Sequence, residues 1–292
     1  MSASPEPVLI RRPKPGVAAR AWAFVRHHAL NVYGVLALGY LMLPIGVVVA
    51  FSFNDPPGRF NFAWSGFTFE HWADPLGVAA IGHAISVSLK VAALATVCAT
   101  ALGTLIAMAL VRYGFRGRGP LNFLIFLPLA APEIVLGASL LTLFLNLGVQ
   151  LGFWTIVLAH IMFSISFVVV TVKARLVGFD RHLEEAAMDL YATPWQTFRH
   201  VTLPLIAPAI LAGGLLAFAL SIDDFVITFF NSGTEVTFPL FVWGAARAGV
   251  PPQVNVIGTI IFLVAVGLMV ASILIQWRRE KAAQAAFASE PA

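Results

Sequence analysis

Three carboxylates lie inside long apolar runs of the sequence, where ionised side chains are costly. Glu133 follows a proline in one run, and Asp223 and Asp224 are adjacent near the end of another. Ionisable groups at membrane depth usually face a bundle interior or a water-filled path. Carboxylates without compensating cations suit a cationic solute, because they offset the desolvation of its ammonium groups. We therefore take Glu133, Asp223 and Asp224 as candidate residues of a solute path.

One lysine competes for these acids. Lys90 falls a few residues into another apolar run, at a depth similar to that of the two aspartates. A structural pair between Lys90 and one aspartate would neutralise that carboxylate and leave two acids uncompensated. Adjacent residues on a helix point about 100° apart. We therefore predict that one of Asp223 and Asp224 lines the path and that the other pairs within the protein.

The sequence offers little for catalysis or metal binding. The single cysteine, Cys98, has no partner for a disulfide or a thiolate metal site. No lysine follows a glycine, so the chain has no P-loop and cannot hydrolyse ATP through one. His160 has no second ligand at i+3 or i+4, and we expect it to hydrogen-bond to a neighbouring helix. The chain is predicted to be neither an enzyme nor a holder of a metal or cofactor, since an enzyme would need a convergent cluster of such groups.

The elements that must carry these residues are membrane-spanning helices. Hydrophobic residues make up 59% of the 292 positions and charged residues 11%, whereas soluble domains carry about 25% charged residues. A span takes about 20 apolar residues. Six segments meet this requirement, at approximately 29–51, 83–111, 121–146, 153–175, 205–230 and 255–277. The first is too long for a signal peptide and lacks a cleavage site. The sequence thus predicts an all-α membrane protein with six transmembrane helices (29–277) between tails 1–28 and 278–292.

Basic residues predict the orientation of these spans. Of the 18 lysines and arginines, about fifteen lie in the tails and in two alternate loops, while the opposite loops hold Arg59 and Arg247. Cytoplasmic loops carry an excess of such residues, so both termini and the loop 176–204 are expected in the cytoplasm. The net charge of +4 does not indicate a nucleic-acid partner, because the basic residues are not gathered on one face.

The loop 176–204 reads as a helical hairpin. An apolar stripe at i, i+3, i+4 and i+7 predicts a first short helix, on Leu183, Ala186, Ala187 and Leu190. A second start follows, with Thr193 as N-cap, Pro194 at the first position and Gln196 completing a capping box. Its apolar side carries Trp195, Phe198 and Val201, and Pro204 is expected to end the helix. The stripe either packs under the chain's own bundle or meets another surface.

This hairpin resembles the EAA loop of ATP-binding-cassette importer permeases. Glu185-Ala186-Ala187 and Leu203-Pro204 stand at the family's distance. Val201 replaces the family's isoleucine and Tyr191 its glycine, so the turn is either strained or closed differently. The resemblance implies a type I importer permease fold whose hairpin docks into an ATPase subunit. The implied coupling residues are Glu184, Glu185, Ala186, Ala187, Asp189, Tyr191, Leu203 and Pro204.

Segments at 69–72, 132–135, 220–224 and 249–255 look like those of spermidine/putrescine-type permeases. This resemblance implies a bacterial inner-membrane subunit that translocates polyamines or a related cationic solute, with ATP and Mg²⁺ bound by a partner. The implied partners are ATPase subunits, a second permease subunit in a heterodimer, an extracytoplasmic substrate-binding protein and membrane lipid. Iron, sulfate, thiamine, phosphonate or opine permeases remain alternatives, as does a secondary carrier, which would predict inverted repeats.

Overall fold

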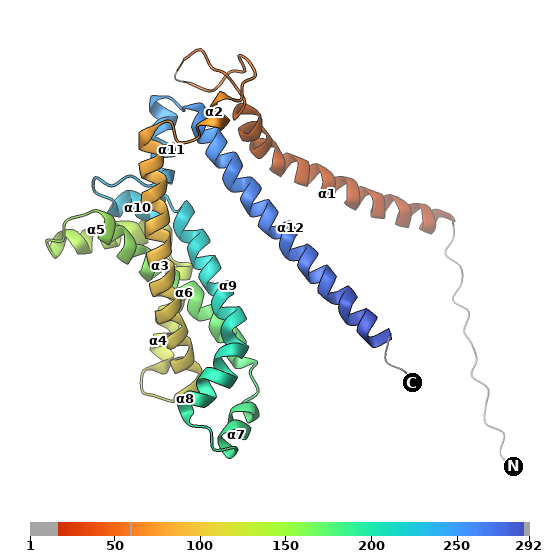
Figure 1. Ribbon diagram of the computed structural model, residues 1–292, viewed down its shortest axis with the longest axis vertical. Coiled ribbons are helices and arrows are strands. Elements are labelled where there is room, and N and C mark those ends of the chain that lie inside the picture. Colours follow the sequence, from red (N-terminus) through yellow and green to blue (C-terminus); the bar gives the residue numbers. More distant parts are fainter. Residues whose placement is uncertain (1–16, 59, 289–292) are drawn as a thin grey trace.

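The computed structural model describes residues 17–58 and 60–288, and regular structure in these ranges is almost entirely helical (Figure 1). Residues 1–16, 59 and 289–292, including the basic residues Arg11, Arg12, Lys14 and Arg59, lie outside the described residues. The helices are α1 (Val17–Phe51), α2 (Glu70–Ala73), α3 (Ala79–Arg112), α4 (Arg118–Ala130), α5 (Glu133–Asn146), α6 (Phe153–Val177), α7 (His182–Asp189), α8 (Pro194–Thr197), the π-helical segment η1 (Phe198–Thr202), α9 (Leu203–Asp223), α10 (Val226–Asn231), α11 (Phe238–Ala248) and α12 (Pro252–Ala288).

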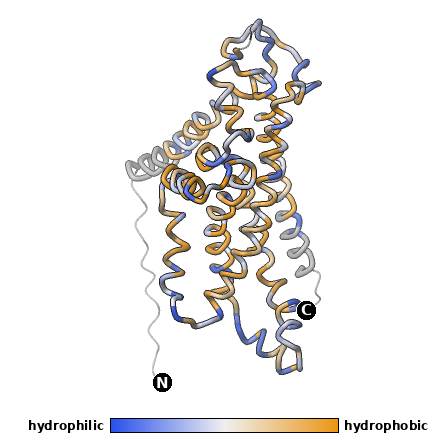
Figure 2. Tube along the Cα trace, turned by 90° about the vertical axis from the view of Figure 1, so that its left-hand side faces the viewer, coloured by the Kyte–Doolittle hydropathy of each residue, from blue (hydrophilic) through white to orange (hydrophobic). Residues whose placement is uncertain are grey.

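Five helical segments are long and apolar enough to cross a membrane, namely α1, α3, α6, the run from α8 through α9, and α12. The pair α4–α5 makes a sixth crossing when it is counted as one bent span. Figure 2 shows hydrophobic residues along the helix shafts and hydrophilic residues in the turns at the two ends. The predicted all-α membrane fold is confirmed.

The third predicted span, 121–146, is broken near its middle. α4 ends at Ala130 and α5 begins at Glu133, and the two helices meet at an angle of 110°. Pro132 causes the break in two ways, because it lacks a backbone N–H and disfavours helical backbone at the preceding residue. Ala131 is accordingly extended, with φ −78° and ψ 140°.

The fifth span differs from its prediction at both ends. Pro204 does not end a helix: the helical run continues from Pro194 to Asp223. The preceding turn widens into η1, in which the N–H of Leu203 bonds to the carbonyl of Phe198. A wider turn gives room for the proline ring, which has no N–H to donate. The span expected to run to residue 230 instead stops at Asp223, and α10 starts separately.

The core of the bundle lies where α3, α6 and α9 pack against one another. Small residues allow this close approach. A Cβ atom on Gly103 would lie 2.8 Å from Val168 Cγ1, and one on Gly214 would lie 3.1 Å from Thr100 Oγ1. Gly213 similarly faces the backbone of Val168. Close backbone approach at small residues is the usual basis of helix association in membranes.

The long terminal helices stand apart from this core. α1 and α12 contact each other, and both extend away from the bundle in Figure 1. The apolar window of α1 has none of its residues buried inside the chain. α7 and α11 lie at opposite ends of the bundle (Figure 1).

Candidate functional site

The hairpin α7–α8 forms one end of the bundle, and its turn closes by a Schellman motif. The N–H of Ala192 bonds to the carbonyl of Ala187, and the N–H of Tyr191 bonds to that of Met188. This motif places its C′ residue in the left-handed region, which glycine usually occupies. Tyr191 holds that position with φ 62°, and no other non-glycine residue of the described ranges has a positive φ. Of the two alternatives for this turn, the strained one is therefore correct.

The second half of the hairpin begins as predicted. The N–H of Gln196 donates to the Thr193 hydroxyl at 3.3 Å, and the N–H of Thr193 donates to Gln196 Oε1 at 2.8 Å. Pro194 occupies the first helical position. The capping box and the N-terminal proline fix where the chain turns back toward the membrane.

Hydrogen bonds to the Glu184 carboxylate hold the hairpin against two spans, and these bonds are termed the clasp. This carboxylate accepts hydrogen bonds from Arg112, in the last turn of α3, and from the hydroxyl of Thr202, at the end of η1. Arg181 adds a bond to the carbonyl of Val111 at 3.2 Å. The side chains of Arg112 and Glu184 are 23% and 16% exposed, so this ion pair is partly buried. These contacts join α7 to α3 and, through η1, to α9.

The other face of the hairpin is open. Glu185, Ala186 and Asp189 are exposed, and Leu190 and Tyr191 at the tip are 83% and 96% exposed. Leu203 is half-buried and Pro204 exposed at the start of α9. The interpretation that the apolar stripe packs under its own bundle does not fit these exposures. Glu184 points inward, unlike the other acids predicted for coupling.

An exposed ion pair precedes α7. His182 Nδ1 donates to Asp180 Oδ1 at 2.7 Å, and the backbone N–H of His182 donates to the same oxygen at 3.0 Å. The side-chain hydrogen bond from His182 lowers the pKa of Asp180. The same bond, followed by the negative charges of Asp180 and Glu185, raises the pKa of His182. The first turn of α7 therefore carries a proton-dependent contact.

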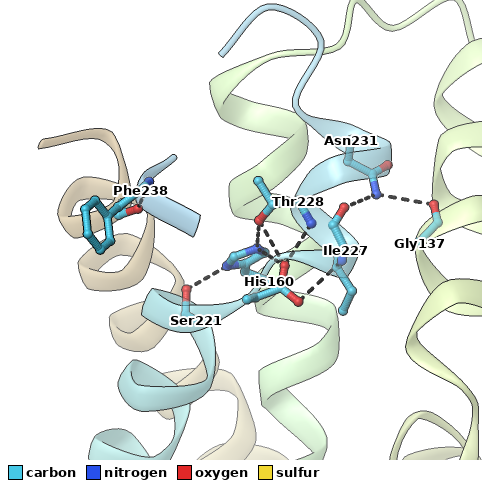
Figure 3. A network of polar contacts seen from close by, with 9 residues as sticks. Gly137, His160, Ser221, Ile227, Thr228, Asn231 and Phe238 are labelled. Carbon is cyan, nitrogen blue, oxygen red and sulfur yellow. Dashed lines mark hydrogen bonds and ion pairs between the residues drawn. The ribbon is translucent and has the colours of Figure 1, made fainter. Parts of the chain in front are cut away.

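Asp224 belongs to a buried network at the break in the fifth span (Figure 3). Its carboxylate accepts the backbone N–H groups of Ile227 at 3.3 Å and Thr228 at 2.8 Å. It thereby satisfies free donors in the first turn of α10, as a capping side chain does. His160 Nε2 lies 3.3 Å from the carboxylate, and both side chains are almost fully buried.

The hydrogen bonds of this network assign the protons of His160. Thr228 donates its hydroxyl proton to Asp224 at 2.9 Å. Thr228 must then accept from His160 Nε2, 2.9 Å away, because a hydroxyl has one proton. In the neutral ring, Nδ1 therefore accepts from the Ser221 hydroxyl at 2.7 Å. The prediction that His160 hydrogen-bonds to neighbouring helices is confirmed.

Hydrogen bonds also fix the C-terminal end of α10. The side chain of Asn231 donates to the carbonyl of Gly137 in α5 at 3.3 Å, and the Thr155 hydroxyl of α6 donates to the Asn231 carbonyl at 2.7 Å. α10 is thus held between α5 and α6, and α9 and α10 are joined at a fixed break.

Asp223 and Glu133 lie in different surroundings. Asp223 lines a cavity of about 420 Å³ formed with α11 and α12. Glu133 is exposed in the first turn of α5 and does not line that cavity. Lys90 is exposed and forms no ion pair within 4 Å among the residues that the structure describes. The fold therefore does not gather the three predicted path carboxylates at one point, and Asp224 pairs with His160 rather than Lys90.

Residues 99–278, well over half of the chain, match the family described as "Binding-protein-dependent transport system inner membrane component". The chain belongs to this family. The match runs from the middle of α3 through the hairpin to α12. The chain is therefore a multi-pass component of an inner-membrane transport system. Members of this family are non-catalytic membrane subunits.

Two relatives extend the family match toward the N-terminus. The permease protein PotC of the Escherichia coli K12 spermidine/putrescine transport system is 40% identical over 237 residues, covering 81% of this chain and 89% of PotC. The permease protein PotI of the E. coli K12 putrescine transport system is 42% identical over 246 residues, covering 80% and 86%. A bacterial importer of alginate shares the fold, with a TM-score of 0.63 at 18% identity over 91% of this chain and 99% of the alginate importer chain.

Several residues of this transport component escaped sequence analysis. Arg112, at the end of a predicted span, binds Glu184, 72 positions away. The pairing of His160 with Asp224 spans 64 positions. No periodicity or capping pattern connects residues so distant, although the carboxylates themselves were visible as charges in apolar runs.

Proposed function

We propose that this chain is a permease subunit of an ATP-binding-cassette importer and forms part of the translocation path for polyamines. The substrate is inferred from the sequence identity of 40% and 42%, over four-fifths of the chain, with permeases named for spermidine and putrescine. The chain itself has no P-loop, so ATP and Mg²⁺ bind a partner ATPase. A second permease subunit, in a heterodimer, completes the path, and a substrate-binding protein delivers the solute, as the family name implies.

The open face of α7 is the proposed ATPase contact. It combines exposed Glu185 and Ala186 with the exposed apolar side chains of Leu183 and Leu190. A small residue at the centre of an exposed apolar stripe allows another surface to approach closely. The clasp through Glu184 then carries movement of the docked hairpin to α3 and α9. Leu203 and Pro204, where η1 passes into α9, lie on the route of that movement.

Asp223, with Asp224 and Glu133, marks the proposed solute path. Asp224 contributes by fixing the break at which Asp223 is presented. Glu133 stands at the other broken span, beside the N-terminus of α5. Broken helices in transport proteins commonly line substrate sites, which supports placing the path near these two breaks.

The test uses the full complex purified from membranes and reconstituted in proteoliposomes. We expect ATP-driven uptake of spermidine or putrescine. Ala186→Asp should release the ATPase subunit and abolish uptake while membrane insertion is retained. Ala248→Asp is the matched control, because it makes the same change at an exposed helical position at the opposite end of the molecule. Uptake that proceeds without any ATPase would instead identify a secondary carrier.

A further inference from the structure

An open apolar groove runs along the bundle where α3 and α9 pack side by side (Figure 1). It has a volume of about 690 Å³ and extends along α3 from Thr96 to Met108. At 1.5 Å per residue this stretch is about 18 Å long, or about three turns of a helix. The walls include side chains that are between 63% and 71% exposed: Val97, Leu105, Leu211 and Leu215. The groove therefore has the length and the apolar surface to take a helix of another chain.

Three threonines of α3 line this groove, and their hydroxyl groups have no hydrogen-bond partner among the described residues: Thr96, Thr100 and Thr104. Other helical threonines of this protein, such as Thr171 and Thr259, donate to the carbonyl four residues before them. The three unpaired hydroxyl oxygens are buried, and rotation about the Cα–Cβ bond can bring each into the groove. The hydrocarbon tail of a lipid offers such a group no hydrogen bond, whereas a polar side chain on a helix does. The groove therefore fits a protein helix better than a lipid tail.

Lys90 lies on the same face of α3, nearer the start of the helix. Three further exposed residues follow it at i+4, i+7 and i+11: Leu94, Val97 and Ala101. Lys90 is itself exposed and forms no ion pair within 4 Å in the part of the chain that the structure describes. Of the helices packed against α3, α6 and α11 contain no acid, and Asp223 of α9 forms no ion pair among these residues either. Lys90 therefore has no counter-ion within the described chain.

The counter-ion of Lys90 has to come from outside this chain, because an ionised group within a span is costly unless it is paired. The transported solute does not supply it, since the proposed polyamine is itself a cation. We propose that a membrane-spanning helix of the second permease subunit lies in the groove and carries a carboxylate that pairs with Lys90. A polar side chain of that helix bonds to the threonine hydroxyls. This inference rests on the proposed pair of permease subunits and names one surface at which they meet.

Carbodiimide coupling tests the ion pair in the full complex within its membrane. Dicyclohexylcarbodiimide enters the membrane and activates carboxylates, which then form an amide bond with a lysine amine in contact with them. We expect a covalent product of the two permease subunits, joined at Lys90, in the wild-type complex. Lys90→Arg is the control: it keeps the charge, and so the complex, but its guanidinium stays protonated and should give no product. A product that joins Lys90 to an acid of its own chain would overturn the proposal.

Co-purification tests the contact independently of coupling chemistry. Lys90→Met removes the charge and leaves the partner's carboxylate unpaired, so recovery of the second permease subunit should fall about tenfold or more. Lys90→Arg should recover it as the wild type does. Ala101→Trp fills the groove and should also lower recovery, while Ala212→Trp, at an exposed position of α9 outside the groove, should not. The amount of each variant in the membrane checks that insertion is retained.

The outcomes separate this contact from the proposed function. If no second permease subunit co-purifies with the wild-type chain, the proposed pair is wrong and this contact is wrong with it. If the second subunit co-purifies and both Lys90→Met and Ala101→Trp retain it, the pair stands and the groove contact is wrong. Absence of any coupling at Lys90, together with full assembly of Lys90→Met, would assign the counter-ion to an anionic lipid headgroup and so overturn the proposal.

Discussion

At the scale of single residues, Tyr191 carries a conformational cost that its surroundings do not repay. A non-glycine residue in the left-handed region costs about 1–2 kcal/mol. The side chain is 96% exposed, so contacts within this chain cannot offset that cost. The hairpin closes with full hydrogen bonding nevertheless, which makes its turn less stable than the same turn with glycine.

Tyr191→Gly is therefore expected to stabilise the turn by about 1 kcal/mol. Amide hydrogen exchange over residues 186–192 should slow by about fivefold, since that free energy changes an opening equilibrium by this factor. Leu190→Gly is the control: Leu190 has φ −86°, so glycine gains nothing there and exchange should become faster. Equal effects of the two variants on hydrogen exchange would contradict backbone strain at Tyr191.

His182 gives the hairpin a dependence on pH. Its pKa is raised above the ordinary value of 6.5 by the bond to Asp180, so the folded turn binds the proton more tightly than the unfolded turn. Its contribution to stability is complete below pH 6.5 and disappears as the pH rises through the folded-state pKa. Asp180 has a pKa lowered from 3.8, so its contribution is present above that value and disappears as the pH falls through the folded-state pKa.

The bond between His182 and Asp180 should thus order the first turn of α7 most between pH 3.8 and 6.5, the ordinary pKa values of the two groups. NMR titration of the His182 ring in the reconstituted complex should give a midpoint above 6.5. Asp180→Asn should return the midpoint toward that value, because both the hydrogen bond to a charged acceptor and the nearby charge are lost. An unshifted midpoint in the wild type would show that the hydrogen bond between His182 and Asp180 does not form.

At the scale of elements, the clasp between α7 and the spans is the contact most open to a direct test. Glu184→Ala should loosen α7 by about 1–3 kcal/mol, because it leaves the partly buried Arg112 without its acceptor. Hydrogen exchange over His182–Asp189 measures this loosening. Exchanging the charges, with Arg112→Glu and Glu184→Arg together, should restore part of the loss, and the double-mutant cycle gives the coupling energy.

Glu185→Ala is the control for the clasp. Glu185 is adjacent in sequence but exposed, so its removal should leave exchange in α7 close to that of the wild type. A Glu184→Ala variant with unchanged exchange would mean that packing of α7 and η1 alone holds the hairpin.

The elements also show what the sequence can predict. Apolar runs located every span, and the capping box at Thr193 marked the start of α8, because these signals are local. The effect of a proline on its helix is not predictable from the local sequence. Pro132 breaks a span by 110°, while Pro204 lies inside a continuous helical run, because η1 widens the turn before it. Whether a helix accommodates a proline depends on neighbouring turns and packing, which short patterns do not encode.

At the scale of the whole molecule, the two candidate regions lie toward opposite ends of the bundle. The hairpin lies at one end, and Asp223 lies near α11 and the start of α12 toward the other (Figure 1). α9 begins at Leu203 beside the hairpin and ends at Asp223. This single helix of 21 residues, about 31 Å long at 1.5 Å per residue, is the direct connection between them.

The predicted orientation puts the hairpin in the cytoplasm and the loop before α11 outside, and cysteine labelling tests both at once. The single native cysteine is first removed by Cys98→Ser. Leu190→Cys and Thr234→Cys then place one thiol at an exposed position in each loop. A membrane-impermeant maleimide should label Thr234→Cys in intact cells and Leu190→Cys only after permeabilisation, while both should label in detergent. Labelling of Leu190→Cys in intact cells would place the hairpin outside, where no ATPase could bind it. The excess of lysine and arginine on the hairpin side argues against that outcome, since such residues are retained in the cytoplasm.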